Sequence, residues 1–247
     1  MGKKFLLISL VAVAASFAGG FFVANALNRN ELNSLRTEND RLKSASTEIS
    51  DTNSDASISD DELRSKIAQA DANPSDLAYQ KNLGLALYKY AAMKSDRGLL
   101  KESARILDRA AKLKKDDFDV IVGLGNAHFD MGYFGKDTAE LGVARDIYGR
   151  ALVLKPDDVE VRTDLGLTYF LADPPDDAHA IEAFQRSLKN DPKHAKTLEF
   201  LIQSLIRQKN ITDAENYLAR LRAADPTNET LNGLENKITE AKNAQHK

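Results

Sequence analysis

Four histidines are the residues of this chain whose side chains most readily bind a metal or transfer a proton. They are His128, His179, His194 and His246. A helical metal site commonly places two histidines four residues apart, and no pair here has that spacing. The sequence also contains no cysteine, which excludes disulfides, thiol chemistry and cysteine-based zinc sites. We therefore expect no metal site.

Three pairs of adjacent aspartates in predicted turns are another possible source of general acids and bases. They are Asp116-Asp117, Asp157-Asp158 and Asp176-Asp177, each between two helical patterns. Acid–base catalysis needs carboxyl groups whose surroundings shift their pKa, and an exposed turn does not provide this. Aspartates in turns are instead suited to helix caps. The sequence also lacks the glycine-rich phosphate and dinucleotide loops and the Gly-x-Ser-x-Gly elbow. We therefore expect neither an enzyme nor a cofactor.

The composition sets further limits. The chain has 247 residues, of which 43% are hydrophobic, enough to bury a sizeable core. Its 34 basic and 37 acidic residues give a net charge of −3, so no basic excess favours nucleic acid as a partner.

A two-helix pattern repeats four times between Pro74 and Pro226. The first helix of each unit carries Leu83-Gly84, Leu124-Gly125, Leu165-Gly166 or Leu201-Ile202. The second helix carries Leu107-x-x-Ala110, Tyr148-x-x-Ala151, Phe184-x-x-Ser187 or Leu218-x-x-Leu221. Two apolar helical faces per unit cannot close a core alone, so neighbouring units must stack.

The third unit carries the fullest pattern, with Leu165-Gly166-x-x-Tyr169, then Ala180-x-x-x-Phe184, then Pro192. In these residues the chain resembles the tetratricopeptide repeat (TPR) family. The resemblance implies an all-α, right-handed superhelix of four helix pairs within residues 60–245. The units span 75–116, 117–157, 158–192 and 193–226, with flanking helices at 60–72 and 228–243. His128 stands where the family usually has an aromatic, so we expect a packed core imidazole.

The first two units are longer than the third and fourth, and the extra residues fall between their two helices, at 93–99 and 134–140. Seven residues are about two helical turns, so each of these helices should be one turn longer. In the third unit, Asp173-Pro174-Pro175-Asp176-Asp177 must end the helix.

The resemblance also implies a concave groove, lined by the first helices, that binds a protein or peptide. One expected stripe of this groove is Tyr88, Phe129, Phe170 and Ile206. A second is Lys81, Val122, Thr163 and Glu199, and a third is Leu85, Asn126, Leu167 and Gln203. TPR domains that clamp a carboxylate tail place basic residues where this chain has Glu160 and Asp164, and these acids would repel a carboxylate.

The first 28 residues predict a membrane anchor. Lys3-Lys4 precede an uncharged stretch at 5–27, long enough for a helix to cross the hydrocarbon core of a membrane. A cleaved signal peptide is the alternative, because Ala24-Asn25-Ala26 resembles a cleavage site. The short basic head favours a single-pass protein of the inner membrane with its repeats outside the cytoplasm.

Residues 29–43 predict a juxtamembrane helix, in which Leu32, Leu35, Asn39 and Leu42 have heptad spacing. A coiled coil at 31–43 would support self-association, although the stretch is short for one. Residues 44–59 predict a flexible polar linker.

We therefore expect a non-enzymatic, membrane-tethered scaffold that binds a segment of another envelope protein. The alternative is an accessory TPR subunit of cytochrome c maturation, which would present apocytochrome to a haem lyase.

Overall fold

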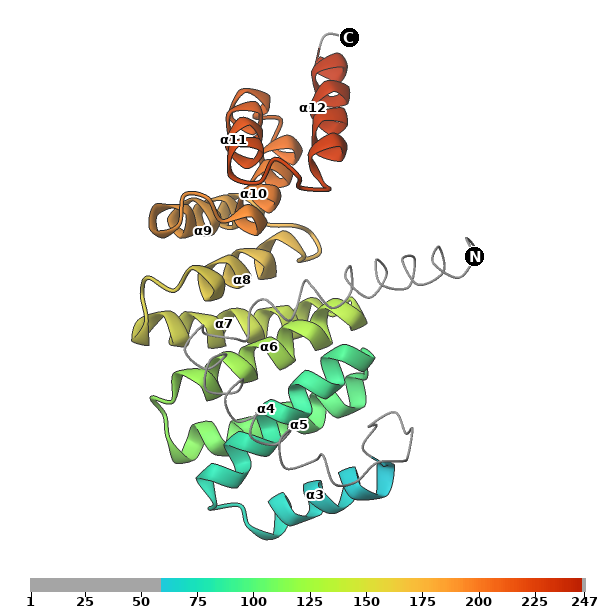
Figure 1. Ribbon diagram of the computed structural model, residues 1–247, viewed down its shortest axis with the longest axis vertical. Helices are drawn as coiled ribbons and strands as arrows, with labels where there is room; N and C mark the ends of the chain where they lie inside the picture. Colours follow the sequence, from blue (N-terminus) through green and yellow to red (C-terminus); the bar gives the residue numbers. More distant parts are fainter. Residues whose placement is uncertain (1–58, 246–247) are drawn as a thin grey trace, which may run out of the picture. The chain divides into compact units, whose positions relative to one another are not determined.

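A computed structural model describes residues 59–245 of the chain. The expected membrane anchor, juxtamembrane helix, possible cleavage site and nearly all of the linker lie outside these residues, as does His246. Within residues 59–245 there are ten helices and no strand, which confirms the all-helical fold (Figure 1). The helices are α3 (Asp60–Ala72), α4 (Leu77–Lys94), α5 (Arg97–Leu113), α6 (Phe118–Gly135), α7 (Thr138–Leu154), α8 (Val159–Phe170), α9 (Asp177–Asn190), α10 (Ala195–Arg207), α11 (Ile211–Ala224) and α12 (Leu231–Gln245).

The chain forms two compact units, Met1–Gln69 and Ala70–Lys247. In the first unit the structure describes only the end of the linker and most of α3. The Ser59 hydroxyl accepts a hydrogen bond from the Glu62 N–H at 3.2 Å, as expected of a helix cap.

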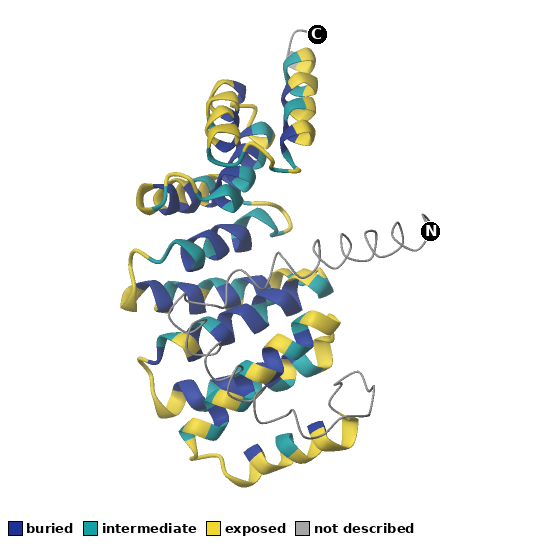
Figure 2. Ribbon diagram, viewed as in Figure 1, coloured by how far each residue is buried: buried dark blue, intermediate teal, exposed yellow. Residues whose placement is uncertain are grey.

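The second unit is a stack of four helix pairs, α4–α5, α6–α7, α8–α9 and α10–α11, followed by α12. Each second helix also packs against the first helix of the next pair, so the core continues from pair to pair. The buried face of α12, made by Leu231, Leu234 and Ile238, completes the stack at its C-terminal end (Figure 2).

Small residues set the distance between the two helices of a pair. A Cβ atom added to Gly84 would lie 2.7 Å from Leu107, and one added to Gly125 would lie 2.7 Å from Tyr148. At Gly166 it would overlap the ring of Phe184. Glycine therefore allows the first three pairs to pack closely, as the repeat pattern predicts, whereas the fourth pair has Ile202 at this position.

Helix lengths and caps also follow the sequence. The helices of the first two pairs have 17 or 18 residues, whereas α8 to α11 have 12 to 14. The extra turns are therefore where the long units predict them. Asp117, Asp158 and Asp176 each cap a helix by accepting a backbone N–H, and α8 ends before Asp173.

Candidate functional site

Contacts between successive first helices define the side of the stack on which the predicted groove residues lie. Helix α4 packs on α6, and α8 packs on α10. Leu85 of α4 lies against the backbone of α6, where a Cβ atom on Gly123 would overlap it. We call the surface formed by the twelve predicted groove residues the inner face.

Seven of the twelve residues are half-buried. They are Lys81, Leu85, Val122, Phe170, Glu199, Gln203 and Ile206. The other five are buried, namely Tyr88, Asn126, Phe129, Thr163 and Leu167. The expectation that these five point outward is therefore wrong. Neighbouring helices cover several of them: Asn126 accepts a hydrogen bond from Tyr148 of α7, and Thr163 lies within hydrogen-bond distance of Ser187 of α9.

The buried aromatics are held by their neighbours. The ring of Phe129 is parallel to that of Tyr133, with 6.5 Å between the centroids, and Tyr133 is the more exposed of the two at 47%. Burial, with smaller contributions from Asp130 and Asp164, raises the pKa of Tyr88 well above its ordinary value. Of the Phe129–Tyr133 pair, only Tyr133 is exposed to solvent. The repeat pattern does not include Tyr133 because it lies in the extra turn of α6, beyond the length of an ordinary repeat helix.

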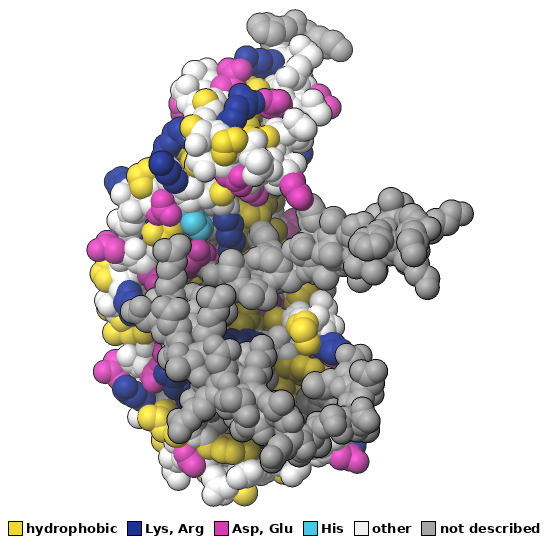
Figure 3. Space-filling model, viewed as in Figure 1, with side chains coloured by type: hydrophobic (Ala, Val, Ile, Leu, Met, Phe, Trp, Pro, Cys, Tyr) yellow, Lys and Arg dark blue, Asp and Glu magenta, His cyan; other side chains and the backbone are white. Residues whose placement is uncertain are grey.

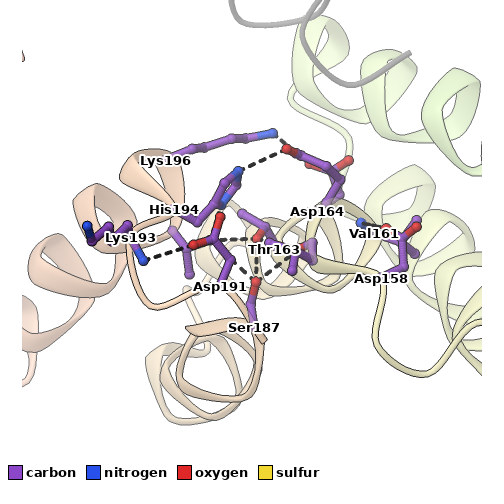
Figure 4. Close-up of polar contacts among 12 residues, drawn as sticks. Asp158, Val161, Thr163, Asp164, Ser187, Asp191, Lys193, His194 and Lys196 are labelled. Atoms are coloured by element: carbon purple, nitrogen blue, oxygen red, sulfur yellow. Dashed lines mark hydrogen bonds and ion pairs between the residues drawn. The ribbon is translucent and has the colours of Figure 1, made fainter. Parts of the chain in front are cut away.

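Thr163 belongs to a buried cluster of hydroxyl groups rather than to an open stripe. Its Oγ1 lies 2.9 Å from Ser187 Oγ and 2.7 Å from Thr197 Oγ1 (Figure 4). Thr163 also donates to the Val159 carbonyl oxygen at 2.7 Å. These bonds join α8, α9 and α10, so the cluster holds the third pair to the fourth.

His194 connects this cluster to a carboxylate. Its Nδ1 lies 2.6 Å from Thr197 Oγ1, and its Nε2 lies 2.9 Å from Glu160 Oε1 (Figure 4). A hydroxyl, an imidazole and a carboxylate in a row can activate a nucleophile, but Thr197 is 0% exposed and no substrate can reach it. Burial favours a raised pKa at Glu160, but the His194 hydrogen bond and the charges of His194 and Lys196 outweigh it and lower the pKa. The arrangement is structural.

The other described histidines also have partners. His128 is not the core imidazole that the repeat pattern predicts: its side chain is 21% exposed, and Nδ1 lies 2.6 Å from Glu140 Oε2. The carboxylate of Glu140 on α7 explains why an imidazole replaces an apolar ring there. His179 stacks on Tyr169 and contacts the cap residue Asp176. No group of residues in the 59–245 range could hold a metal ion.

Ion pairs connect the first helices at the inner face. Lys81 Nζ lies 2.8 Å from Asp117 Oδ1 and 3.0 Å from Asp119 Oδ2. Burial opposes ionisation of Asp117, but the hydrogen bonds from Lys81 and from the Val120 N–H outweigh it and lower the pKa of Asp117. Lys196 of α10 pairs with Asp164 of α8 at 2.8 Å.

Near the C-terminal end of the inner face, Phe170 combines an aromatic surface with a charge. The Arg207 guanidinium carbon lies 3.8 Å from the centroid of the Phe170 ring, and Phe200 packs edge-on against the same ring. Glu199 accepts a hydrogen bond from Asn228 at 2.8 Å. Figure 3 shows hydrophobic and charged side chains interspersed on the visible surface of the stack.

One buried carboxyl group of α6 was not among the predicted residues. Asp130 follows Phe129 on α6, is 1% exposed, and neither of its oxygens has a hydrogen-bond partner. Burial, with a smaller contribution from Asp164, raises the pKa of Asp130 to about 7. Nothing in the spacing of the sequence distinguishes it from an exposed aspartate on a solvated helix face.

A separate open pocket of about 580 Å³ lies between α5, α6 and α7. Its lining includes Arg97, Lys101, Arg105, His128 and Glu140, and none of the twelve inner-face residues. It is therefore distinct from the predicted groove.

Comparisons with known proteins agree with this fold. A family model described as a tetratricopeptide repeat matches residues 178–238. No curated protein matches the chain in sequence. The crystal structure of MamA protein superposes with a TM-score of 0.53 at 18% identity, covering 67% of this chain and 81% of that chain.

Two further solved structures give similar results. MamA from Desulfovibrio magneticus RS-1 has a TM-score of 0.52 at 18% identity, covering 68% of this chain and 86% of that chain. A thermophilic TPR protein from Thermus thermophilus, TTC0263, has a TM-score of 0.50 at 14% identity, with 72% and 96% covered. The chain therefore has a TPR fold. No helix within the described part of the chain is long and apolar enough to cross a membrane.

Proposed function

We propose that this chain is a non-enzymatic scaffold whose inner face binds a segment of another protein. The observation that carries the proposal is the row of partly exposed apolar side chains on successive first helices. They are Leu85 on α4, Val122 and Tyr133 on α6, Phe170 on α8 and Ile206 on α10. A solenoid offers such a surface along its whole length, which suits an extended or helical segment.

Burial of this apolar row would supply most of the affinity, and aromatic residues would contribute most per residue. Phe170 is the aromatic of this row on α8 and is half-buried; Arg207, which lies over its ring, is held there by Asp177. The buried members of the predicted groove, such as Phe129 and Leu167, would support this surface from beneath.

We further propose that residues 5–27 hold the scaffold in the inner membrane, with the repeats outside the cytoplasm. The uncharged stretch behind Lys3-Lys4 supports this proposal. Tethering would raise the effective concentration of the scaffold near envelope partners. Protease added to spheroplasts should digest the repeats of the full chain, and protection of the repeats would refute this orientation.

Proximity labelling from the full chain in its host would test the binding proposal. The informative variant carries Tyr133→Ser and Ile206→Ser together, because both side chains reach the surface of first helices. Val153→Ser is the matched control: it also removes an exposed apolar side chain, 79% exposed, but from the second helix α7. Partners labelled by the wild type and the control but lost from the double variant would support the inner face. An unchanged set of partners, in a double variant that keeps its helical content, would refute it.

Presentation of apocytochrome to a haem lyase would be one specific form of this activity. Normal c-type cytochromes in a deletion strain would exclude it and leave the general proposal in place. The heptad spacing at 31–43 adds the proposal of self-association through this segment, which a monomeric full chain in detergent would refute.

A further inference from the structure

The open pocket of about 580 Å³ between α5, α6 and α7 has a row of basic residues along one side. We call it the α5 pocket, because Arg97, Lys101 and Arg105 line it from α5. Their spacing of four residues places them on one face of that helix, one turn apart. Arg109 continues the same row by one further turn. The row therefore presents four cations in line along α5.

The half of this row nearer the end of α5 is already neutralised by acidic side chains. Asp71 Oδ1 lies 2.6 Å from Nη1 of both Arg105 and Arg109. Glu102 Oε2 also lies 2.6 Å from Arg105. These contacts show which group the row binds, namely a carboxylate held by two cations one turn apart.

The half nearer the start of α5, Arg97 and Lys101, has no such partner. Neither side chain forms an ion pair with a residue of the 59–245 range, and both are exposed. The guanidinium of Arg97 packs against Gly135 at the end of α6, where an added Cβ atom would overlap it. Both cations are therefore accessible, and Arg97 has a defined position beside the pocket.

Two acids also line the α5 pocket, but each already has a partner. Asp108 Oδ2 lies 2.6 Å from Lys112 Nζ, and Glu140 Oε2 lies 2.6 Å from His128 Nδ1. Neither acid pairs with the cations at the start of α5. The cations at this end of the row therefore have charge to offer to a ligand.

The α5 pocket depends on the extra length of the first two units. Arg97 and Gly98 fall within the extra residues 93–99, and Glu140 falls within 134–140. A Cβ atom added to Gly98 would approach only Asp96, so no side chain of α6 or α7 covers the backbone there. The pocket is therefore open where its cations lack acidic partners.

We propose that the α5 pocket binds an acidic segment of a partner protein, whose aspartate or glutamate side chains contact Arg97 and Lys101. This surface is separate from the inner face, so the proposal does not depend on the function proposed above. Residues four apart on a helix have Cβ atoms about 5–6 Å apart. Two acids four residues apart on a helix, or two apart on an extended segment, have a similar separation. Each would form charge-assisted hydrogen bonds with one cation of the row.

The charges around the pocket favour a protein segment with a few acids over a polyanion such as nucleic acid. Asp108 and Glu140 line the same pocket and would repel a densely charged ligand. The chain as a whole has a net charge of −3, so no general basic surface would hold a polyanion in place. The carboxylate of Asp71 is the ligand that the same row of cations already binds.

A library of short random peptides, selected at low salt against the full chain in detergent, tests this proposal. The pocket variant carries Arg97→Gln and Lys101→Gln. The matched control carries Arg150→Gln and Lys189→Gln, which also remove one exposed arginine and one exposed lysine from second helices. We expect the wild type and the control to enrich peptides with two acidic residues at a constant spacing, and the pocket variant to lose them. Equal enrichment of such peptides by all three proteins, or by none, would overturn the proposal.

The best acidic peptide and its neutral form, with glutamine or asparagine in place of the acids, are then measured against all three proteins. We expect the pocket variant to weaken the acidic peptide about tenfold at low salt, since an exposed ion pair contributes up to about fivefold. The neutral peptide should bind all three proteins equally. The advantage of the acidic peptide should also shrink as salt rises, because exposed charges are screened. Equal loss for both peptides would contradict the proposal.

Carbodiimide coupling to the wild type locates the peptide even if the pocket variant loses its helical content. The reagent joins a carboxylate to a lysine amine in contact with it, and Lys101 Nζ is the amine that the α5 pocket offers. Mass spectrometry should find the acidic peptide on Lys101, and coupling confined to lysines outside the pocket would overturn the proposal. Displacement of the peptide by inorganic phosphate, but not by sodium chloride at the same ionic strength, would assign the pocket to phosphate and also overturn it.

The inner-face variant with Tyr133→Ser and Ile206→Ser separates this proposal from the proposed function. It should bind the acidic peptide as tightly as the wild type does. Weaker binding by this variant would place the peptide on the inner face and overturn its assignment to the α5 pocket.

Discussion

The close approach of the two helices in the third pair predicts a large effect for the smallest possible substitution, Gly166→Ala. The new Cβ atom would lie 2.7 Å from Phe184 Cδ1, and closer still to Cε1, whereas carbon atoms normally keep about 3.5–4.0 Å. Phe184 is 0% exposed, so its ring has no solvent-filled space to move into. Overpacking of this kind typically costs about 1–3 kcal/mol.

A second, opposing effect must be subtracted. Alanine is a better helix former than glycine by about 1 kcal/mol, so the net loss for Gly166→Ala should be about 0–2 kcal/mol. Gly149 on α7 provides the matched control, because a Cβ atom there would meet nothing within 4 Å. Gly149→Ala should therefore stabilise the protein, by about 0.5–1 kcal/mol.

Urea unfolding of the full chain in detergent, followed by circular dichroism, measures both variants. Because repeat proteins can lose their units separately, the whole transition is compared rather than its midpoint alone. The expected result is a loss of stability for Gly166→Ala and a gain for Gly149→Ala. If both variants gain equally, the Phe184 ring can move freely and the close-approach argument is refuted.

Three further predictions concern polar groups. Lys81→Met should destabilise the fold by about 1–3 kcal/mol in urea unfolding, because it leaves the largely buried Asp117 without its cation. The pKa of Asp117 is lowered in the folded state. The loss of stability should therefore be full above about pH 4 and should shrink as the pH falls further. Thr163→Val should cost about 1–2 kcal/mol in the same assay, because Ser187 and Thr197 lose a hydrogen-bond partner, and an unchanged stability would contradict the cluster. Because burial raises the pKa of Asp130 to about 7, the wild type should lose stability as the pH rises from about 4 to 7. Asp130→Asn should remove this decline. Stability profiles that run parallel with pH for the two proteins would contradict this prediction.

The helical architecture was predictable because its determinants are local. The spacing of Leu165, Gly166 and Tyr169 defines one face of a helix, and Asp158 caps the start of that helix. The longer first and second units predicted extra helical turns, and α4 to α7 have them. Each of these features depends on residues within a single repeat or on the length of that repeat.

The exposure of the groove residues was not predictable in the same way. Helical spacing places Phe129 and Phe170 at equivalent positions, yet Phe129 is 4% exposed and Phe170 is half-buried. The neighbours of the two rings differ between repeats: Tyr133, in the extra turn of α6, stacks parallel to Phe129, whereas α8 ends at Phe170, whose ring contacts Phe200 and Arg207 of α10. A repeat pattern compares equivalent positions in successive units, so it does not include Tyr133, which lies in a helical turn that α8 lacks.

The burial and the raised pKa of Asp130 are the features least predictable from the sequence, because they depend on residues from several repeats. Its sequence neighbours, Phe129 and Met131, are typical of any amphipathic helix, and the packing of α4, α5 and α7 on α6 leaves Asp130 only 1% exposed. The same packing changes its ionisation: an aspartate on a helix surface is ordinarily solvated and charged, whereas burial raises the pKa of Asp130 to about 7. The repeat architecture therefore explains why this acid cannot be recognised from the sequence.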